Sequence, residues 1–88
     1  MKLREGFLTH DMDGGLVMVA AGAAAQRFAG MARANGAATV ILKSLMQDTD
    51  EESIVRIMAE TYDAPEEVLR ADVQRVLVQL RSIGALEE

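Results

Sequence analysis

The sequence predicts an α+β domain with a winged helix-turn-helix-like arrangement, in which a three-stranded antiparallel sheet is followed by three helices (β-β-β-α-α-α). Residues 5–34 are rich in glycine, alanine and short apolar runs, whereas residues 35–86 show helical periodicity with capping signals. The 88 residues suffice for a single domain, 1–88, and not for two. Three short helices bury their apolar faces by packing on each other and on one face of the sheet.

Three strands are expected in the first part of the chain. Residues 7–10 form the first strand, and the Asp-Gly-Gly of residues 13–15 is a strong hairpin signal because glycine accepts positive φ. The apolar run of residues 16–21 has the length and the valine content of a strand. A turn at residues 22–25 then leads into a third strand at residues 26–32. There, the flanking glycines and the short length favour a strand over the helix that its alanines prefer.

Two helices are expected next. The first runs from about residue 36 to residue 47, and Asn35 is a good N-cap for it. The second spans residues 50–62, with Thr49 and Glu52 as a capping box. The acidic residues of its first turn suit the positive end of a helix.

The third helix is expected to begin near Pro65, whose missing N–H is tolerated in a first turn. Gly84 is placed to end it. Its apolar residues recur at helical spacing and predict a long buried stripe. They are Leu69, Val73, Val76, Leu77, Leu80 and Ile83.

Composition argues against several classes of protein. The absence of cysteine excludes disulfides, thiolate metal sites and cysteine nucleophiles. A formal net charge of −5 argues against a nucleic-acid partner, because such binding rests on a basic surface. No apolar run approaches the ~20 residues of a membrane helix, and no signal-peptide layout is present. We therefore expect a cytoplasmic protein with no membrane partner.

Motifs for catalysis or metal binding are not recognisable. His10 is the one histidine, so neither a zinc site nor a Ser-His-Asp set is plausible, and it is expected on a strand facing solvent. Asp11 and Asp13 lack the rest of a calcium loop. The acidic run of residues 48–52 is better explained as a helix cap than as a pair of catalytic carboxylates. We expect no enzyme activity, no metal and no cofactor.

Several segments, in this order and at this spacing, resemble the PqqD family, whose founding member serves the biosynthesis of the cofactor pyrroloquinoline quinone. The resemblance covers nearly the whole chain. The segments that carry it are Leu3-Arg4-Glu5-Gly6-Phe7, Asn35-Gly36-Ala37-Ala38 with Ile41-Leu42, Glu52-Ser53-Ile54-Val55, Tyr62-Asp63, Asp72-Val73 with Leu77 and Leu80, and Ile83-Gly84-Ala85-Leu86.

The resemblance implies a recognition element for ribosomally made, post-translationally modified peptides. Such a domain is a non-catalytic adaptor, or peptide chaperone. It binds the leader segment of a precursor peptide and presents the rest to a modifying enzyme, often a radical S-adenosylmethionine enzyme. The family's peptide typically joins the sheet beside the third strand and lies against the third helix.

The third strand of a meander is an edge with unpaired N–H and C=O groups, to which an extended peptide can pair. Small residues here either let a peptide backbone approach or accommodate a helix packed on them, and both interpretations stay open. Phe28 is expected as a core anchor more than as a ligand contact. The candidate strand residues are Arg27, Phe28, Ala29, Gly30 and Met31.

One flank of the third helix should form the wall of the groove. At about 100° per residue, two flanks border the stripe centred on Val76 and Leu80. The flank that mixes apolar and polar residues is favoured, so the candidate wall residues are Val68, Asp72, Arg75, Val76 and Gln79. The opposite flank carries Arg70, Gln74 and Arg81.

Two other functions fit the expected fold. A winged-helix DNA-binding regulator is disfavoured, because residues 50–62 contain Arg56 alone among basic residues and the arginines of the third helix are spread. A structural self-association module would pair the same edge strand with a second copy, giving a homodimer.

Overall fold

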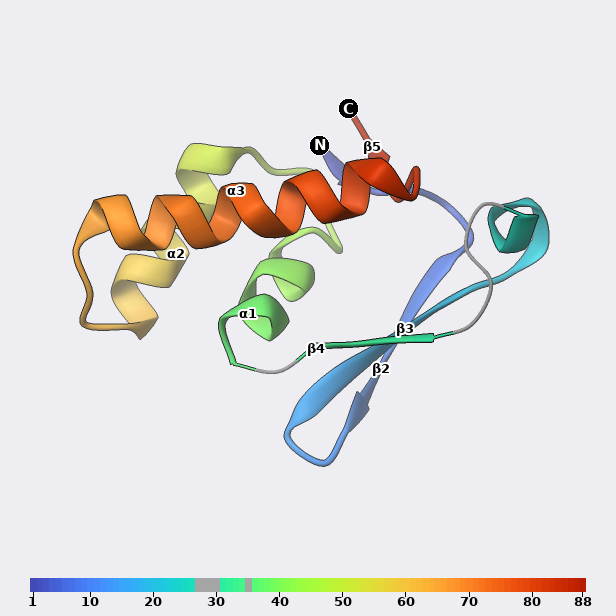
Figure 1. Cartoon of the computed structure of the whole chain (residues 1–88), viewed down its shortest axis with the longest axis horizontal. Coiled ribbons are helices and arrows are strands. Elements are labelled where there is room, and N and C mark those ends of the chain that lie inside the picture. The colour runs from blue at the N-terminus through green and yellow to red at the C-terminus, as the bar shows by residue number, and fades with distance from the viewer. Residues whose placement is uncertain (27–30, 35) are drawn as a thin grey trace.

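The computed structural model describes residues 1–26, 31–34 and 36–88. Figure 1 shows a three-stranded sheet at one end of the molecule, with α1 lying between the sheet and the long helix α3. The elements in chain order are β1 (Lys2–Leu3), β2 (Phe7–Met12), β3 (Gly15–Ala20), the 3₁₀ helix η1 (Gly22–Gln26), β4 (Met31–Ala34), α1 (Ala37–Ser44), α2 (Glu51–Thr61), α3 (Glu66–Ser82) and β5 (Leu86–Glu87). The expected sheet followed by three helices is confirmed.

The sheet is an antiparallel meander with the strand order β2-β3-β4. Asp13 and Gly14 both have positive φ, at 46° and 83°, and Met12 pairs with Gly15 across them. This is the geometry of a two-residue hairpin turn that matches the twist of the strands, so the hairpin prediction is confirmed. β4 pairs with β3 on one side only and is an edge of the sheet.

The predicted third strand was misplaced at both ends. Gln26 belongs to η1, because the alanine-rich segment before it follows the helical preference of alanine. β4 continues to Ala34, two residues beyond the predicted end at residue 32, because its ladder with β3 runs as far as the Leu16–Ala34 pair. Residues 27–30, the middle of the predicted strand, lie outside the described residues.

The first two helices differ slightly from their predicted bounds. α1 ends at Ser44, three residues before the predicted end at residue 47. Its predicted N-cap, Asn35, lies outside the described residues. α2 is capped by Asp50, not by Thr49: the Asp50 carboxylate accepts a 2.7 Å hydrogen bond from the Ser53 amide. This hydrogen bond holds the pKa of Asp50 below its usual value.

The third helix agrees with its two end signals. Pro65 takes the N-cap position, just before Glu66 rather than within the first turn. Beyond the C-cap Ile83, Gly84 has φ 69°, the left-handed conformation that ends helices. The chain then pairs β5 with β1, matching Leu86 with Leu3. This two-stranded clasp was not predicted, because two residues are too few to show an alternating pattern.

The core lies between the three helices and the inner face of the sheet. Its fully buried large side chains come from every helix and are Ile41, Leu45, Ile54, Met58, Val73 and Leu77. The sheet contributes Phe7, Leu16 and Met18 to the same cluster. No helix in the described part of the chain is both long and apolar enough to span a membrane.

Candidate functional site

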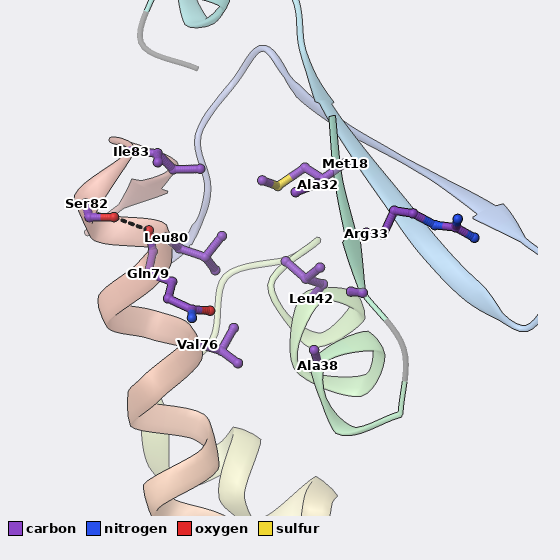
Figure 2. A pocket seen from close by; sticks show the side chains of 11 residues that line it. Met18, Ala32, Arg33, Ala38, Leu42, Val76, Gln79, Leu80, Ser82 and Ile83 are labelled. Carbon is purple, nitrogen blue, oxygen red and sulfur yellow. Dashed lines mark hydrogen bonds between the residues drawn. The ribbon is translucent and has the colours of Figure 1, made fainter. Parts of the chain in front are cut away.

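A cavity of about 270 Å³ lies between β4 and α3, with α1 at its base. Figure 2 shows side chains from the three elements pointing into it. Its lining is mainly apolar, and the one charged residue, Arg33, directs its guanidinium away from the cavity. The lining residues are Met18, Ala32, Arg33, Ala34, Ala38, Leu42, Val76, Gln79, Leu80, Ser82 and Ile83. We call this space the β4–α3 cavity.

Small side chains keep the β4–α3 cavity open on the sheet side and at its base. Ala32 and Ala34 alternate along β4 toward the cavity, and Ala38 lines it from α1. The three methyl groups leave space that a leucine or methionine would fill. The backbone of β4 borders this space with the edge that β3 does not cover. An apolar hollow therefore lies beside unpaired main-chain donors and acceptors.

The cavity wall on α3 is formed by its C-terminal half. Val76 and Leu80 are buried and line the cavity together with Ile83 and the exposed Gln79. The Ser82 hydroxyl donates to the Gln79 carbonyl at 2.6 Å. The side-chain amide of Gln79 has no hydrogen-bond partner among the residues that the structure describes, so it is free to donate to and accept from a bound ligand.

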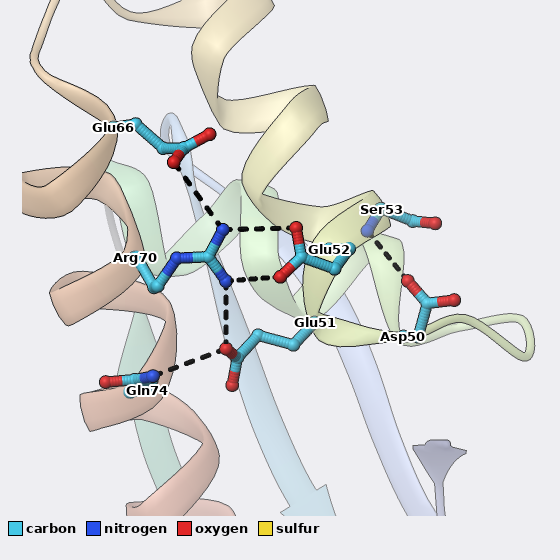
Figure 3. A network of polar contacts seen from close by, with 7 residues as sticks. All are labelled: Asp50, Glu51, Glu52, Ser53, Glu66, Arg70 and Gln74. Atoms are coloured by element: carbon cyan, nitrogen blue, oxygen red, sulfur yellow. Dashed lines mark hydrogen bonds and ion pairs between the residues drawn. The ribbon is translucent and has the colours of Figure 1, made fainter.

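The opposite flank of α3 is occupied by contacts with α2. Arg70 donates to both oxygens of Glu52, at 2.6 and 3.1 Å, and to Glu51 at 3.2 Å (Figure 3). Gln74 donates to Glu51 at 3.3 Å. The Arg70 guanidinium lowers the pKa of Glu52, and the hydrogen bonds to Glu52 raise the pKa of Arg70 above its usual value. This flank holds two helices together and does not border the cavity.

The structure brings together two of the five predicted wall residues, Val76 and Gln79, which line the β4–α3 cavity. The other three lie further toward the N-terminus of α3 and do not line it. Val68 is exposed there, and Asp72 pairs with Arg75 at 3.2 Å.

The predicted strand residues are placed only in part. Met31 lies in β4 and pairs with Val19 of β3. Arg27, Phe28, Ala29 and Gly30 lie outside the described residues, so their proposed peptide contacts stay predictions.

Several cavity residues were missed from the sequence. Ala34 was missed because the predicted third strand ended at residue 32, whereas Ala32 lay inside that strand but was not among the candidate contacts. Ala38 and Leu42, four residues apart on α1, lie on one face of that helix and were not among the candidate wall residues. Ile83 follows Val76 and Gln79 on the same side of α3, and its helical spacing was the signal available.

The basic residues of α3 are engaged within the chain. Arg70 pairs with Glu51, Glu52 and Glu66, Arg75 pairs with Asp72, and Arg81 pairs with Glu88 at 2.8 Å. Helices that bind DNA present free cations to phosphates, so this pairing weighs against the DNA-binding hypothesis. Within the described residues, no group of three or more histidine, cysteine, aspartate or glutamate side chains could hold a metal ion.

Comparisons with known proteins identify the family and agree with the fold. Residues 15–86 match the family model described as "Coenzyme PQQ synthesis protein D (PqqD)". The solved structure described as "TbiB1 in Complex with the TbiA(beta) Leader Peptide" superposes with a TM-score of 0.83 and 17% sequence identity. The match covers 99% of this chain and 95% of that chain, so the two share a fold over their whole length. No curated protein matches the chain in sequence.

Proposed function

The chain belongs to the PqqD family, as its sequence resemblance predicted, and from this premise we propose that it is a non-catalytic adaptor for a ribosomally made precursor peptide. The adaptor binds the leader segment and presents the remainder to a modifying enzyme. The observation that carries the proposal is the uncovered edge of β4 beside the apolar β4–α3 cavity. In the similar solved structure, the partner of TbiB1 is a leader peptide, which supports the choice of ligand.

Binding proceeds by strand addition. The leader segment lies along β4 in extended conformation and pairs with its outward N–H and C=O groups, extending the sheet to four strands. Alternate side chains of the added strand point toward the helices, where the cavity takes an apolar one. Gln79 completes the wall with a side-chain amide that can bond the peptide main chain. Affinity thus comes from the backbone and selectivity from the cavity.

The chemistry belongs to a partner enzyme, which we propose to be a radical S-adenosylmethionine enzyme, as in pyrroloquinoline quinone biosynthesis. Holding the leader leaves the following segment of the peptide tethered and free. Tethering raises the effective concentration of that segment at a bound enzyme to about the millimolar range. No residue of this chain needs to take part in the reaction.

An amide NMR titration tests the proposal. The labelled protein is titrated with the leader segment of a precursor peptide encoded beside its own gene, and with a scrambled peptide of the same composition as the control. We expect shifts at residues 31–34 of β4 and 76–83 of α3 with the leader alone. Shifts confined to α2, or equal shifts with the scrambled peptide, would contradict the groove. The same shifts on concentrating the protein without peptide would instead favour self-pairing of β4.

A further inference from the structure

The edge strand β4 presents two faces with different chemistry. Ala32 and Ala34 face the cavity, and Arg33 between them faces the opposite side of the sheet, because side chains alternate along a strand. Figure 2 shows the Arg33 guanidinium directed away from the cavity. Its row across the outer face continues through Val17 of β3 to His10 of β2. Any strand added to β4 will extend this row.

Arg33 is exposed and has neither a hydrogen bond nor an ion pair in the part of the chain that the structure describes. Arg33 and Asp13 line one hollow of the surface, and Asp13 forms no ion pair with Arg33. Most other cations among the described residues are engaged in hydrogen bonds or ion pairs: Arg4 donates to the carbonyls of Gly84 and Leu86, and Lys43 pairs with Asp11 at 3.4 Å. A free cation thus stands on the strand that is open to a partner, in a chain whose net charge is −5.

We propose that Arg33 selects an acidic side chain in the bound peptide, so that the recognised segment carries aspartate or glutamate next to the apolar residue that fills the β4–α3 cavity. This inference rests on the strand addition proposed above. Residues directly opposite on paired strands have Cβ atoms about 4.5–5.5 Å apart, and opposite charges there attract. The peptide residue opposite Arg33 lies on the same outward face of the sheet as Arg33. The peptide residues before and after it point toward the cavity, whichever way the peptide runs. The recognised pattern is an acidic residue beside an apolar one.

Substitution of Arg33 can also disturb the sheet, and the test must separate that effect from recognition. Its cross-strand partner Val17 is only 5% exposed although it lies on the outer face, and it belongs to no part of the helical core. The aliphatic stem of an arginine can cover such a residue while its charge stays in water. Arg33→Gln keeps much of the stem without the charge, and Arg33→Glu reverses the charge. Arg56→Glu, at an exposed position of α2, is the matched control.

The first experiment selects a displayed library of short random peptides on three proteins: the parent, Arg33→Glu and Arg56→Glu. We expect peptides from the parent and from Arg56→Glu to be enriched in aspartate or glutamate immediately next to a large apolar residue. Peptides selected on Arg33→Glu should keep the apolar residue and carry lysine or arginine beside it. The same acidic enrichment on all three proteins, or none on the parent, would overturn the selection by Arg33.

The second experiment measures the affinity of one selected peptide by calorimetry. Arg33→Gln should weaken binding about two- to five-fold, the range of an exposed ion pair, and Arg33→Glu about ten-fold. Replacing the acidic residue of the peptide by arginine should restore binding to Arg33→Glu and weaken binding to the parent. Equal affinities of all these pairs would overturn the proposal while leaving strand addition intact. Selected peptides that shift no amide in β4 or α3 would overturn both.

Discussion

The two flanks of α3 differ in how their polar and apolar groups are used. On the flank facing α2, Arg70 and Gln74 meet the carboxylates of Glu51 and Glu52. On the flank facing β4, Val76, Gln79 and their neighbours line a cavity that no element of the described chain fills. One flank joins two helices of the same chain, and the other is left open beside an unpaired strand edge. The flank facing β4 has no side-chain hydrogen bond to another helix among the described residues, and it is the surface on which we propose that the peptide binds.

The largest effect is a loss of stability, expected for the buried apolar stripe of α3 that lies between the two flanks. Leu77 is fully buried, so Leu77→Ala removes packed methyl groups and leaves a cavity. We expect the free energy of unfolding to fall by about 2–5 kcal/mol in urea denaturation. Its neighbour Val78 is 60% exposed, and Val78→Ala should change stability by less than about 0.5 kcal/mol. Equal losses for the two variants would place the core of α3 on a different face.

Peptide binding on the flank facing β4 should be blocked by a side chain that fills the β4–α3 cavity. Ala38→Leu puts a larger apolar side chain into the β4–α3 cavity from α1. Leader affinity should fall at least about ten-fold, because the peptide side chain loses its space. Stability should stay level or rise by about 0.5–1 kcal/mol, as cavity filling often stabilises. The control is Ala59→Leu at an exposed position of α2, which should alter neither quantity. Unchanged peptide binding in Ala38→Leu would remove the cavity from the proposed mechanism.

Local signals with a single physical cause were read correctly from the sequence. The Asp13-Gly14 turn and the Gly84 helix end both depend on positive φ, which few residues adopt. Where two local preferences compete, the sequence did not show which one would prevail. Gln26 joined the alanines before it in η1 rather than starting a strand, and Asp50 capped α2 in place of the adjacent Thr49. At each position the two alternatives, helix or strand at Gln26 and a cap at Thr49 or Asp50, lie within one or two residues of each other.

The type of site could be predicted from the sequence, but only some of the residues that line it could. A free third edge followed from the meander. The flank of α3 favoured for its mixed composition contributes Gln79 to the cavity, and the neighbouring apolar stripe contributes Val76. The position along the flank did not follow, because it depends on where β4 lies against α3. The cavity lies beside the C-terminal half of α3, so Val68 and Asp72 of the N-terminal half do not line it. Such placement is set by long-range packing, which helical periodicity does not contain.

A pair of substitutions sharpens the contrast between the flanks. Gln79→Ala removes a free amide beside the cavity, so leader affinity should fall about two- to ten-fold while the Tm stays unchanged. Arg70→Met removes the pairing with α2, so the Tm should fall by a few degrees while affinity stays unchanged. Calorimetry and thermal unfolding on the same samples give both quantities. If Arg70→Met weakened peptide binding and Gln79→Ala did not, the assignment of the two flanks would be reversed.

The smallest effect is a pH dependence expected from the paired flank alone. The pKa of Glu52 is lowered in the folded protein by its hydrogen bonds with Arg70. A lowered folded pKa stabilises the protein above the pKa of the unfolded state, and this contribution is lost as the pH falls below the ordinary glutamate pKa and through the lower folded pKa. Glu52→Gln should therefore have a lower Tm than the parent at pH 7, and its Tm should fall less than that of the parent on acidification. Gln79→Ala carries no titratable change and should follow the parent at every pH. The difference should be modest, because solvent screens the exposed Glu52 carboxylate. Parallel curves for Glu52→Gln and the parent would mean that Arg70 aligns α2 and α3 by contact alone, without a net contribution from its charge.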